Sequence, residues 1–165
     1  MQSFRVIKPT AALVPYVRHY WVLSDDALAP VSERTLPVGC VQMVFHRGRQ
    51  LFSLTEGRLQ PSSFISGQAF GYSDVESTGM LEMIVVVFQP FAAKAFLHMP
   101  VSEFRGMNVN TEETGDPLLV DLGRRIADMP DRVACIRLIE EFLLSRLYAF
   151  PEYNLKRVLT VLEAV

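Results

Sequence analysis

The three histidines of this chain, His19, His46 and His98, are not spaced like the ligands of a catalytic metal. A metal-dependent barrel enzyme typically takes two histidines close together on one strand, a carboxylate and a further histidine. No two histidines here share a predicted strand segment, and the chain has no His-x-His. We therefore expect no metal site, no cofactor and no metal-dependent catalysis.

The sequence also lacks the motifs of nucleophilic catalysis and of phosphate binding. Ser66 and Ser73 lie in predicted turns, and neither is the centre of a Gly-x-Ser-x-Gly elbow. The nearby glycines do not lead from a strand into a helix that carries a lysine, as a phosphate-binding loop does. We assign no catalytic residue and expect that the chain is not an enzyme.

Aromatic and polar side chains within apolar strands favour the binding of a small molecule. Trp21, the only tryptophan, follows Tyr20, and adjacent strand residues face opposite sides, so one of the two points inward. An aromatic face suits a sugar ring or an apolar effector, although Trp21 could also be part of the core. Arg34 could anchor a carboxylate or a pair of hydroxyls, or form a salt bridge across its turn.

Four further polar residues complete the predicted ligand site. Gln42 and His46 share one face of an apolar strand and need partners inside the protein or in water. Gln68 and Tyr72 flank a glycine turn and could close the mouth of a barrel. The predicted ligand-binding residues are Tyr20, Trp21, Arg34, Gln42, His46, Gln68 and Tyr72.

The elements that would position these residues are strands first and helices afterwards. Short apolar segments, separated by glycine and proline, occur at 17–23, 41–46, 51–54 and 81–88 and predict a sandwich or a barrel. Both faces of residues 83–88 are apolar, which predicts a strand buried on both sides. Residues 9–16 favour a short helical turn.

Helices are predicted after Pro90. Residues 91–99 favour a short helix, and Asp116-Pro117 is typical of a helix cap followed by the first helical residue. Residues 132–149 form a helix with two apolar stripes, and a last helix begins near Asn154. Two stripes exceed what the surface helix of a monomer needs, so we expect a homodimer. Its predicted interface is the stripe formed by Cys135, Leu138 and Phe142.

The composition fits one globular domain and gives no sign of nucleic-acid binding. The 165 residues are 50% hydrophobic, with a net charge of −2 and a pI of about 5.9. A DNA-binding domain usually has a basic face, which the scattered basic residues here do not form. No apolar run is long enough to span a membrane, and no signal peptide is visible. Cys40 and Cys135 are interpreted as reduced, buried thiols of a cytoplasmic protein.

A series of motifs in a fixed order resembles one family. In chain order they are Pro9, Leu13, Val17, Tyr20-Trp21, Arg34-Thr35-Leu36-Pro37-Val38-Gly39, the strand 41–45, Phe64-Ile65-Ser66-Gly67-Gln68, Gly79, Val85-Val86-Val87-Phe88-Gln89-Pro90 and Pro100-Val101-Ser102-Glu103-Phe104. Over roughly residues 7–150 they resemble the N-terminal, effector-binding and dimerisation domain of AraC-type transcriptional regulators.

The resemblance implies a fold, a function and partners. The fold would be a cupin-like β-barrel over residues 1–110, followed by a helical self-association portion over 111–150 and the start of a linker or a truncated helix over 151–165. The domain would bind a small effector, such as a sugar or an organic acid, and pair with a copy of itself. Promoter DNA would be bound only through a C-terminal helix-turn-helix domain that this chain lacks.

Two other functions stay open from the sequence. One is a small metal-dependent enzyme of the cupin type, which bound metal in the purified chain would reveal. The other is a protein-interaction module without a ligand, for which a filled interior would be expected.

Overall fold

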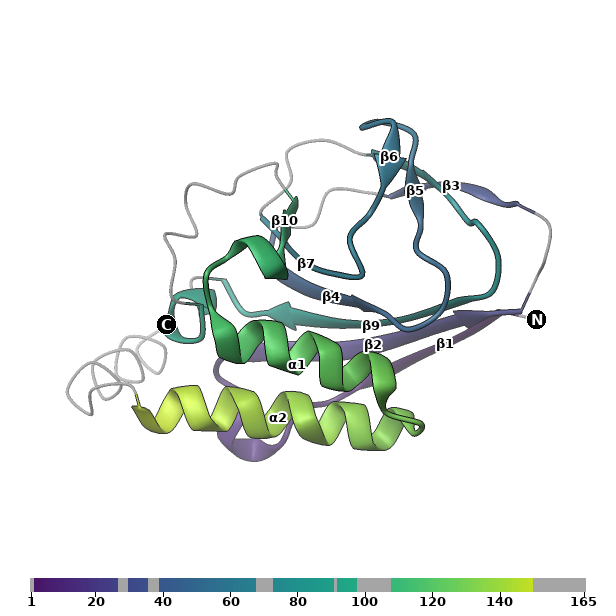
Figure 1. Ribbon diagram of the computed structural model, residues 1–165. Coiled ribbons are helices and arrows are strands. Elements are labelled where there is room, and N and C mark those ends of the chain that lie inside the picture. The colour runs from purple at the N-terminus through teal and green to yellow at the C-terminus, as the bar shows by residue number, and fades with distance from the viewer. Residues whose placement is uncertain are drawn as a thin grey trace.

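The computed structural model describes residues 2–26, 30–35, 39–67, 73–90, 92–97 and 108–149. Two antiparallel sheets and a pair of helices lie in successive layers, with the larger sheet in the middle (Figure 1). This order of elements agrees with the prediction of many strands followed by helices. The last predicted helix, from Asn154, and the segment 151–165 lie outside the described residues.

The larger sheet has six strands in the order β1-β2-β9-β4-β7-β10. Its strands are β1 (Gln2–Ile7), β2 (Val17–Asp25), β4 (Gln42–His46), β7 (Ser63–Ser66), β9 (Leu81–Phe88) and β10 (Asn108–Asn110). The smaller sheet has four strands in the order β3-β8-β5-β6. Its strands are β3 (Ser32–Thr35), β5 (Phe52–Ser53), β6 (Arg58–Leu59) and β8 (Ser73–Glu76).

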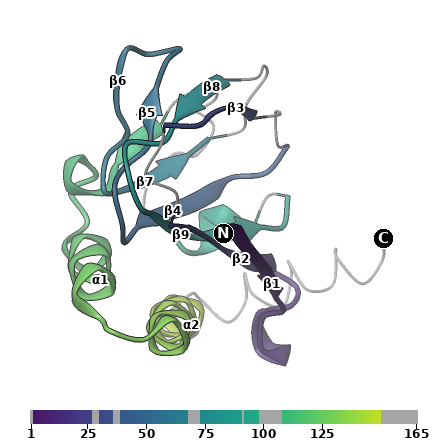
Figure 2. The same ribbon diagram turned by 90° about the vertical axis from the view of Figure 1, so that its right-hand side faces the viewer.

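The expected closed barrel is not what the strands form. Among the described residues no strand of the smaller sheet pairs with a strand of the larger one, so the two sheets face each other as an open sandwich (Figure 2). Length contributes to this, because the edge strand β6 and its neighbour β5 have only two residues each. Strands that short cannot continue the hydrogen-bonding ladder around to β1 or β10.

Alternation along the central strands separates two apolar faces. On β9, the strand predicted to be buried on both sides, residues 83–88 are all buried, which confirms that prediction. Tyr20, Val86 and Met43 are in register across β2, β9 and β4 and face the helices. The next residues along those strands face the smaller sheet instead.

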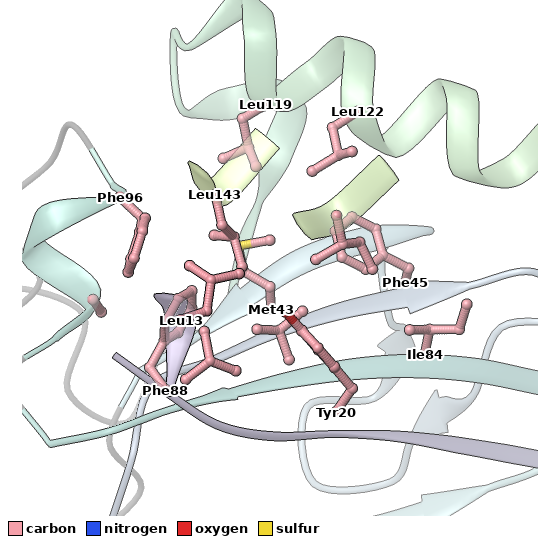
Figure 3. Close-up of a cluster of buried hydrophobic side chains, with 14 of the residues drawn as sticks. Leu13, Tyr20, Met43, Phe45, Ile84, Phe88, Phe96, Leu119, Leu122 and Leu143 are labelled. Atoms are coloured by element: carbon pink, nitrogen blue, oxygen red, sulfur yellow. The ribbon is translucent and has the colours of Figure 1, made fainter. Parts of the chain in front are cut away.

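The core between the larger sheet and the helices is the main apolar core of the protein. It contains the largest fully buried side chains, several of which Figure 3 shows pointing toward one another from sheet and helices. They include Leu13, Tyr20, Met43, Phe45, Ile84, Phe88, Phe96, Leu119 and Leu143. Leu13 comes from the 3-10 turn η1 (Ala11–Leu13), as the sequence predicted, and Phe96 follows the turn η2 (Ala93–Ala95).

Local capping sets the start of the first helix. Asp116 is the N-cap of α1 (Pro117–Asp128), where its side chain accepts a hydrogen bond from the Leu119 amide, and Pro117 takes the first helical position. The helix ends before Met129, whose carbonyl oxygen accepts a hydrogen bond from the Arg47 guanidinium. A cation at this end is favoured because the helix dipole is negative there.

The second helix, α2 (Arg132–Ala149), uses both of its apolar stripes within this chain. Cys135 is fully buried and Leu138 is 8% exposed, and both belong to the main core. Phe142 is half-buried against the same core. The second stripe is occupied because α2 packs against α1 as well as against the sheet. Dimerisation stays a prediction, but Cys135 and Leu138 are not available as its surface.

A buried ion pair ties α2 to the start of α1. One nitrogen of the Arg146 guanidinium lies 2.7 and 2.8 Å from the two Asp116 carboxylate oxygens. Another donates to the Phe96 carbonyl oxygen at 3.2 Å, and the group lies 4.7 Å from the centre of the Phe142 ring. One side chain therefore fixes both helices and the turn after β9.

A glycine on α1 allows that helix to approach the sheet closely. A Cβ atom at Gly123 would lie 2.6 Å from the Ser63 hydroxyl, which is itself 2.6 Å from the Thr111 hydroxyl. We expect Gly123→Ala to destabilise the protein by about 1 kcal/mol in urea unfolding, despite the better helix propensity of alanine. Ser63→Ala should restore part of that loss in the double variant. A Gly123→Ala protein more stable than wild type would contradict this.

Candidate ligand-binding pocket

A pocket lies between the two sheets, on the face of the larger sheet that the helices do not cover. Its volume is about 190 Å³. For scale, an engineered apolar cavity of about 150 Å³ is sufficient to bind benzene. The residues that line it are Gln2, Trp21, Leu23, Asp25, Val31, Glu33, Leu51, Val75, Ser77, Leu81 and Met83.

Side chains of β2 and β9 form the base of the pocket. Trp21, Leu23 and Asp25 alternate with buried residues that face the helices, and Leu23 is in register with Met83. The Trp21 ring lies 5.7 Å from the ring of Phe4, which is 60% exposed on the edge strand β1. Trp21 is thus only partly covered by protein and presents aromatic surface at the side of the pocket.

The smaller sheet supplies the opposite wall. Glu33 on β3 is in register with Val75 on β8, and both line the pocket. The Val31 amide donates to the Ser77 hydroxyl at 2.9 Å, and the Ser77 amide donates to the Val31 carbonyl oxygen at 3.0 Å. These two bonds hold the edge of the wall, where Val31 is 44% exposed.

The charged side chains that line the pocket are both acidic. The apolar surface comes from seven residues, whereas Asp25, Glu33, Gln2 and Ser77 supply the polar atoms. No lysine, arginine or histidine is among the lining residues that the structure describes. The pocket therefore combines an apolar interior with carboxylates, an arrangement suited to a ligand that carries an apolar body and hydrogen-bond donors.

His46 lies behind the pocket on the same face of the larger sheet. It is in register with Met83, packs against the Phe64 ring and is 5% exposed. Its Nε2 lies 2.9 Å from the Gln60 side-chain oxygen, whereas Nδ1 has no hydrogen-bond partner among the described residues. Since the Gln60 oxygen accepts, Nε2 carries the proton and Nδ1 is an acceptor in the neutral ring.

Burial lowers the pKa of His46 below its ordinary value of 6.5, and the hydrogen bond to Gln60 only partly opposes this. The unfolded chain therefore binds a proton near pH 6.5 that the folded protein still excludes. We expect the free energy of unfolding to fall as the pH falls from about 6.5 toward the lower pKa of the folded state.

His46→Gln should remove that part of the acid sensitivity. Urea unfolding at a series of pH values between about 7 and 5 measures it, because the difference between the wild-type and variant curves isolates this side chain from the carboxylates. If the free energy of unfolding changes with pH in the same way in both proteins, His46 has the same pKa in the folded and unfolded states.

The structure brings together part of the predicted ligand site. Trp21 lines the pocket, and Gln42 and His46 lie on the same sheet face without belonging to the lining. Tyr20 faces the helices, where it is fully buried and its hydroxyl donates to Glu140 at 3.1 Å. The Arg34 side chain points outward from the smaller sheet and pairs with Asp74 at 2.9 Å. Gln68 and Tyr72 lie outside the described residues.

Sequence reasoning missed most of the lining. Leu23 and Asp25 could have been found by following Trp21 in steps of two along β2. Glu33 and Val75 carry no such signal, because their place depends on how the smaller sheet sits over the larger one. Glu82 on β9 is not part of the lining, and it accepts a hydrogen bond from Arg132 at 2.9 Å.

Neither a metal-binding cluster nor a membrane-spanning helix is found among the described residues. No group of three or more histidine, cysteine, aspartate or glutamate side chains in these parts of the chain is arranged to hold a metal ion. No helix among the described residues is both long and apolar enough to cross a membrane.

Comparison with known proteins places the chain in a family. A family model described as a domain of unknown function, DUF6597, matches residues 5–110, which is more than half of the chain. The chain therefore belongs to this family. No curated protein matches it.

Among solved structures, one that matches is a crystal structure of CoII HppE in complex with Tris buffer. The identity is 10%, the TM-score is 0.39, and the match covers 53% of this chain and 53% of that one. The alignment thus spans about half the length of the solved protein.

Proposed function

We propose that the chain is the ligand-sensing and self-association domain of a bacterial AraC-type transcriptional regulator, acting in the cytoplasm without catalysing a reaction. The observation that carries the proposal is the pocket between the sheets, with the single tryptophan at its side. The order of motifs that resembles this class of regulators supports the same function. A small effector, a second copy of the chain and a DNA-binding domain elsewhere in the regulator are its proposed partners.

One strand offers a physical route from the pocket to the helices. On β2, Trp21 faces the pocket and its neighbour Tyr20 faces α2. The Tyr20 hydroxyl donates to Glu140 on α2, and the same Glu140 oxygen accepts the Thr10 amide at 2.9 Å. A ligand that shifts β2 would therefore change the contacts of α2. This helix runs to Ala149, next to the point where the resemblance places the DNA-binding domain.

A panel of small molecules tests ligand sensing directly. Sugars, organic acids, amines and apolar compounds are titrated against the purified chain while the fluorescence of Trp21 is followed. We expect at least one class to give a saturable change that is lost in Val31→Phe, because a larger side chain at this exposed edge narrows the pocket. Saturable changes that persist unaltered in Val31→Phe, or none across the panel, would contradict the proposal.

Self-association and regulation need a separate measurement. Fused to a DNA-binding domain that binds its operator only as a dimer, residues 1–165 should repress a reporter gene, and sedimentation velocity of the purified chain at micromolar concentration should show a dimer. The unfused chain should not prefer an operator duplex over a scrambled one in a fluorescence-anisotropy titration. Stoichiometric iron, zinc or manganese in the purified chain would favour the enzyme instead.

A further inference from the structure

We propose that the pocket between the sheets binds a small uncharged molecule, a single apolar ring that carries one hydroxyl group. This inference rests on the proposed ligand-sensing function and names the class of effector that the pocket selects. It differs from the sugar or organic acid that the family resemblance implies, because apolar side chains form most of the lining.

The apolar lining continues a second, smaller core on the face of the larger sheet that is turned away from the helices. The buried residues of this core are Cys40, Val44, Phe64, Met83, Val85 and Val87. Met83 also lines the pocket, and four further lining residues pack against the same core. They are Trp21, Leu23, Leu51 and Leu81, each of which is only partly buried. The pocket is therefore an unfilled end of an apolar core, and an apolar ring placed there would remove these surfaces from water.

The polar residues of the lining leave room for about one hydrogen bond. Gln2 and Glu33 are exposed to water, and Asp25 already interacts with another group of the protein. The Ser77 hydroxyl accepts the Val31 amide at 2.9 Å, so its own proton can still be donated. A single hydroxyl group at the exposed side of the ligand can therefore be satisfied by Ser77 or by water.

A sugar or an ion would lose more hydration in this pocket than the lining replaces. Burying a hydroxyl without a hydrogen-bond partner is costly, and burying a charge is more so. A carboxylate would meet no lysine, arginine or histidine among the lining residues that the structure describes. An ammonium group would leave water for one carboxylate that is exposed, Glu33, and one that is already engaged, Asp25.

The volume limits the ligand to one ring with a short substituent. The pocket holds about 190 Å³, whereas about 150 Å³ is sufficient for benzene. The partly buried Trp21 ring supplies an aromatic surface next to Leu23. An aromatic ligand ring that packs against it gains more than its buried area alone provides.

Three phenols and two charged analogues test the inference in the wild-type chain. Phenol, 4-methylphenol and 4-ethylphenol are neutral at pH 7, and calorimetric titration measures their dissociation constants. We expect the affinity to rise about fourfold with each added carbon, the factor for burying one methylene group. 4-Methylbenzoate and 4-methylbenzylamine keep the methyl-substituted ring and add a negative or a positive charge. Both should bind at least roughly tenfold more weakly than 4-methylphenol.

Matched leucine variants locate the binding site. Leu51→Asn makes part of the apolar wall polar and should weaken the binding of 4-ethylphenol roughly tenfold. Leu59→Asn makes the same change on β6, where Leu59 is 50% exposed and does not line the pocket, and should leave the affinity unchanged. Glu33→Gln should also leave it unchanged, because the proposed ligand carries no charge. Far-UV circular dichroism confirms that each variant is folded.

The outcomes distinguish the ligand class from the function itself. If either charged analogue binds as tightly as 4-methylphenol, or if added carbons bring no gain, the uncharged apolar class is overturned while ligand sensing stands. Equal losses in Leu51→Asn and Leu59→Asn would place the binding elsewhere and overturn the inference too. If Leu51→Asn does not fold, the five ligands in the wild-type chain decide. If none of them binds saturably, the inference is overturned, and the broader panel with Val31→Phe then decides the proposed function independently.

Discussion

Replacing Arg146 with methionine should lower the free energy of unfolding by about 3–5 kcal/mol. The Arg146 side chain is 5% exposed and the Asp116 side chain 7%, so the substitution removes a positive charge from beside a buried carboxylate. It also removes the hydrogen bond to the Phe96 carbonyl oxygen. Methionine fills similar space, so the loss reports charge and hydrogen bonding more than a cavity.

The second substitution Asp116→Asn should recover part of that loss. Asparagine is neutral but can still accept the amide hydrogen bond at the start of α1, so the double variant keeps the helix cap without the buried charge. Arg125→Met is the matched control, because Arg125 is 55% exposed and lies 4.0 Å from Asp121. It should change stability by less than about 0.5 kcal/mol.

Urea unfolding of the three variants and the wild type, followed by circular dichroism, measures these differences. An Arg146→Met protein within about 1 kcal/mol of wild type would mean that water or rearrangement solvates Asp116 easily. Equal losses in Arg146→Met and in the double variant would mean that the buried charge of Asp116 is not the cause.

The elements that sequence predicted well are those with local signals. Asp116 and Pro117 mark the start of α1, and the continuous apolar run of residues 83–88 marks a strand buried on both faces. The sequence predicted the two apolar stripes of α2, but it did not predict which elements each stripe packs against. Periodicity shows that a face is buried, whereas the packing of α1 beside α2 depends on tertiary structure.

The same limit applies to the pocket. Adjacent positions on β2 implied that one of Tyr20 and Trp21 faces inward, but only the register of the sheet shows which one. Arg34 and Glu33 are likewise neighbours, and the direction of each follows from where β8 pairs with β3. The expectation of a barrel failed for a related reason, since the length of β5 and β6 has no clear mark in the sequence.

Substitutions of Tyr20 and Trp21 test whether one face of the larger sheet contributes mainly to stability and the other mainly to ligand binding. Tyr20→Ala should cost about 3–5 kcal/mol, because the side chain is fully buried in the main core and its hydroxyl is bonded to Glu140. Trp21→Ala should cost only about 1–2 kcal/mol, because its ring is partly exposed beside Phe4 and faces an open pocket. The larger residue thus contributes less to stability.

Urea unfolding followed by far-UV circular dichroism serves both variants, since one of them lacks tryptophan. Tyr20→Phe, which keeps the ring and loses the hydrogen bond to Glu140, should account for about 1 kcal/mol of the Tyr20→Ala loss. Calorimetric titration with any ligand that the panel identifies should show binding abolished in Trp21→Ala and retained in Tyr20→Phe. If Trp21→Ala proves as destabilising as Tyr20→Ala, the space between the sheets is a second folding core. The face that the helices leave uncovered would then not be kept open for a ligand.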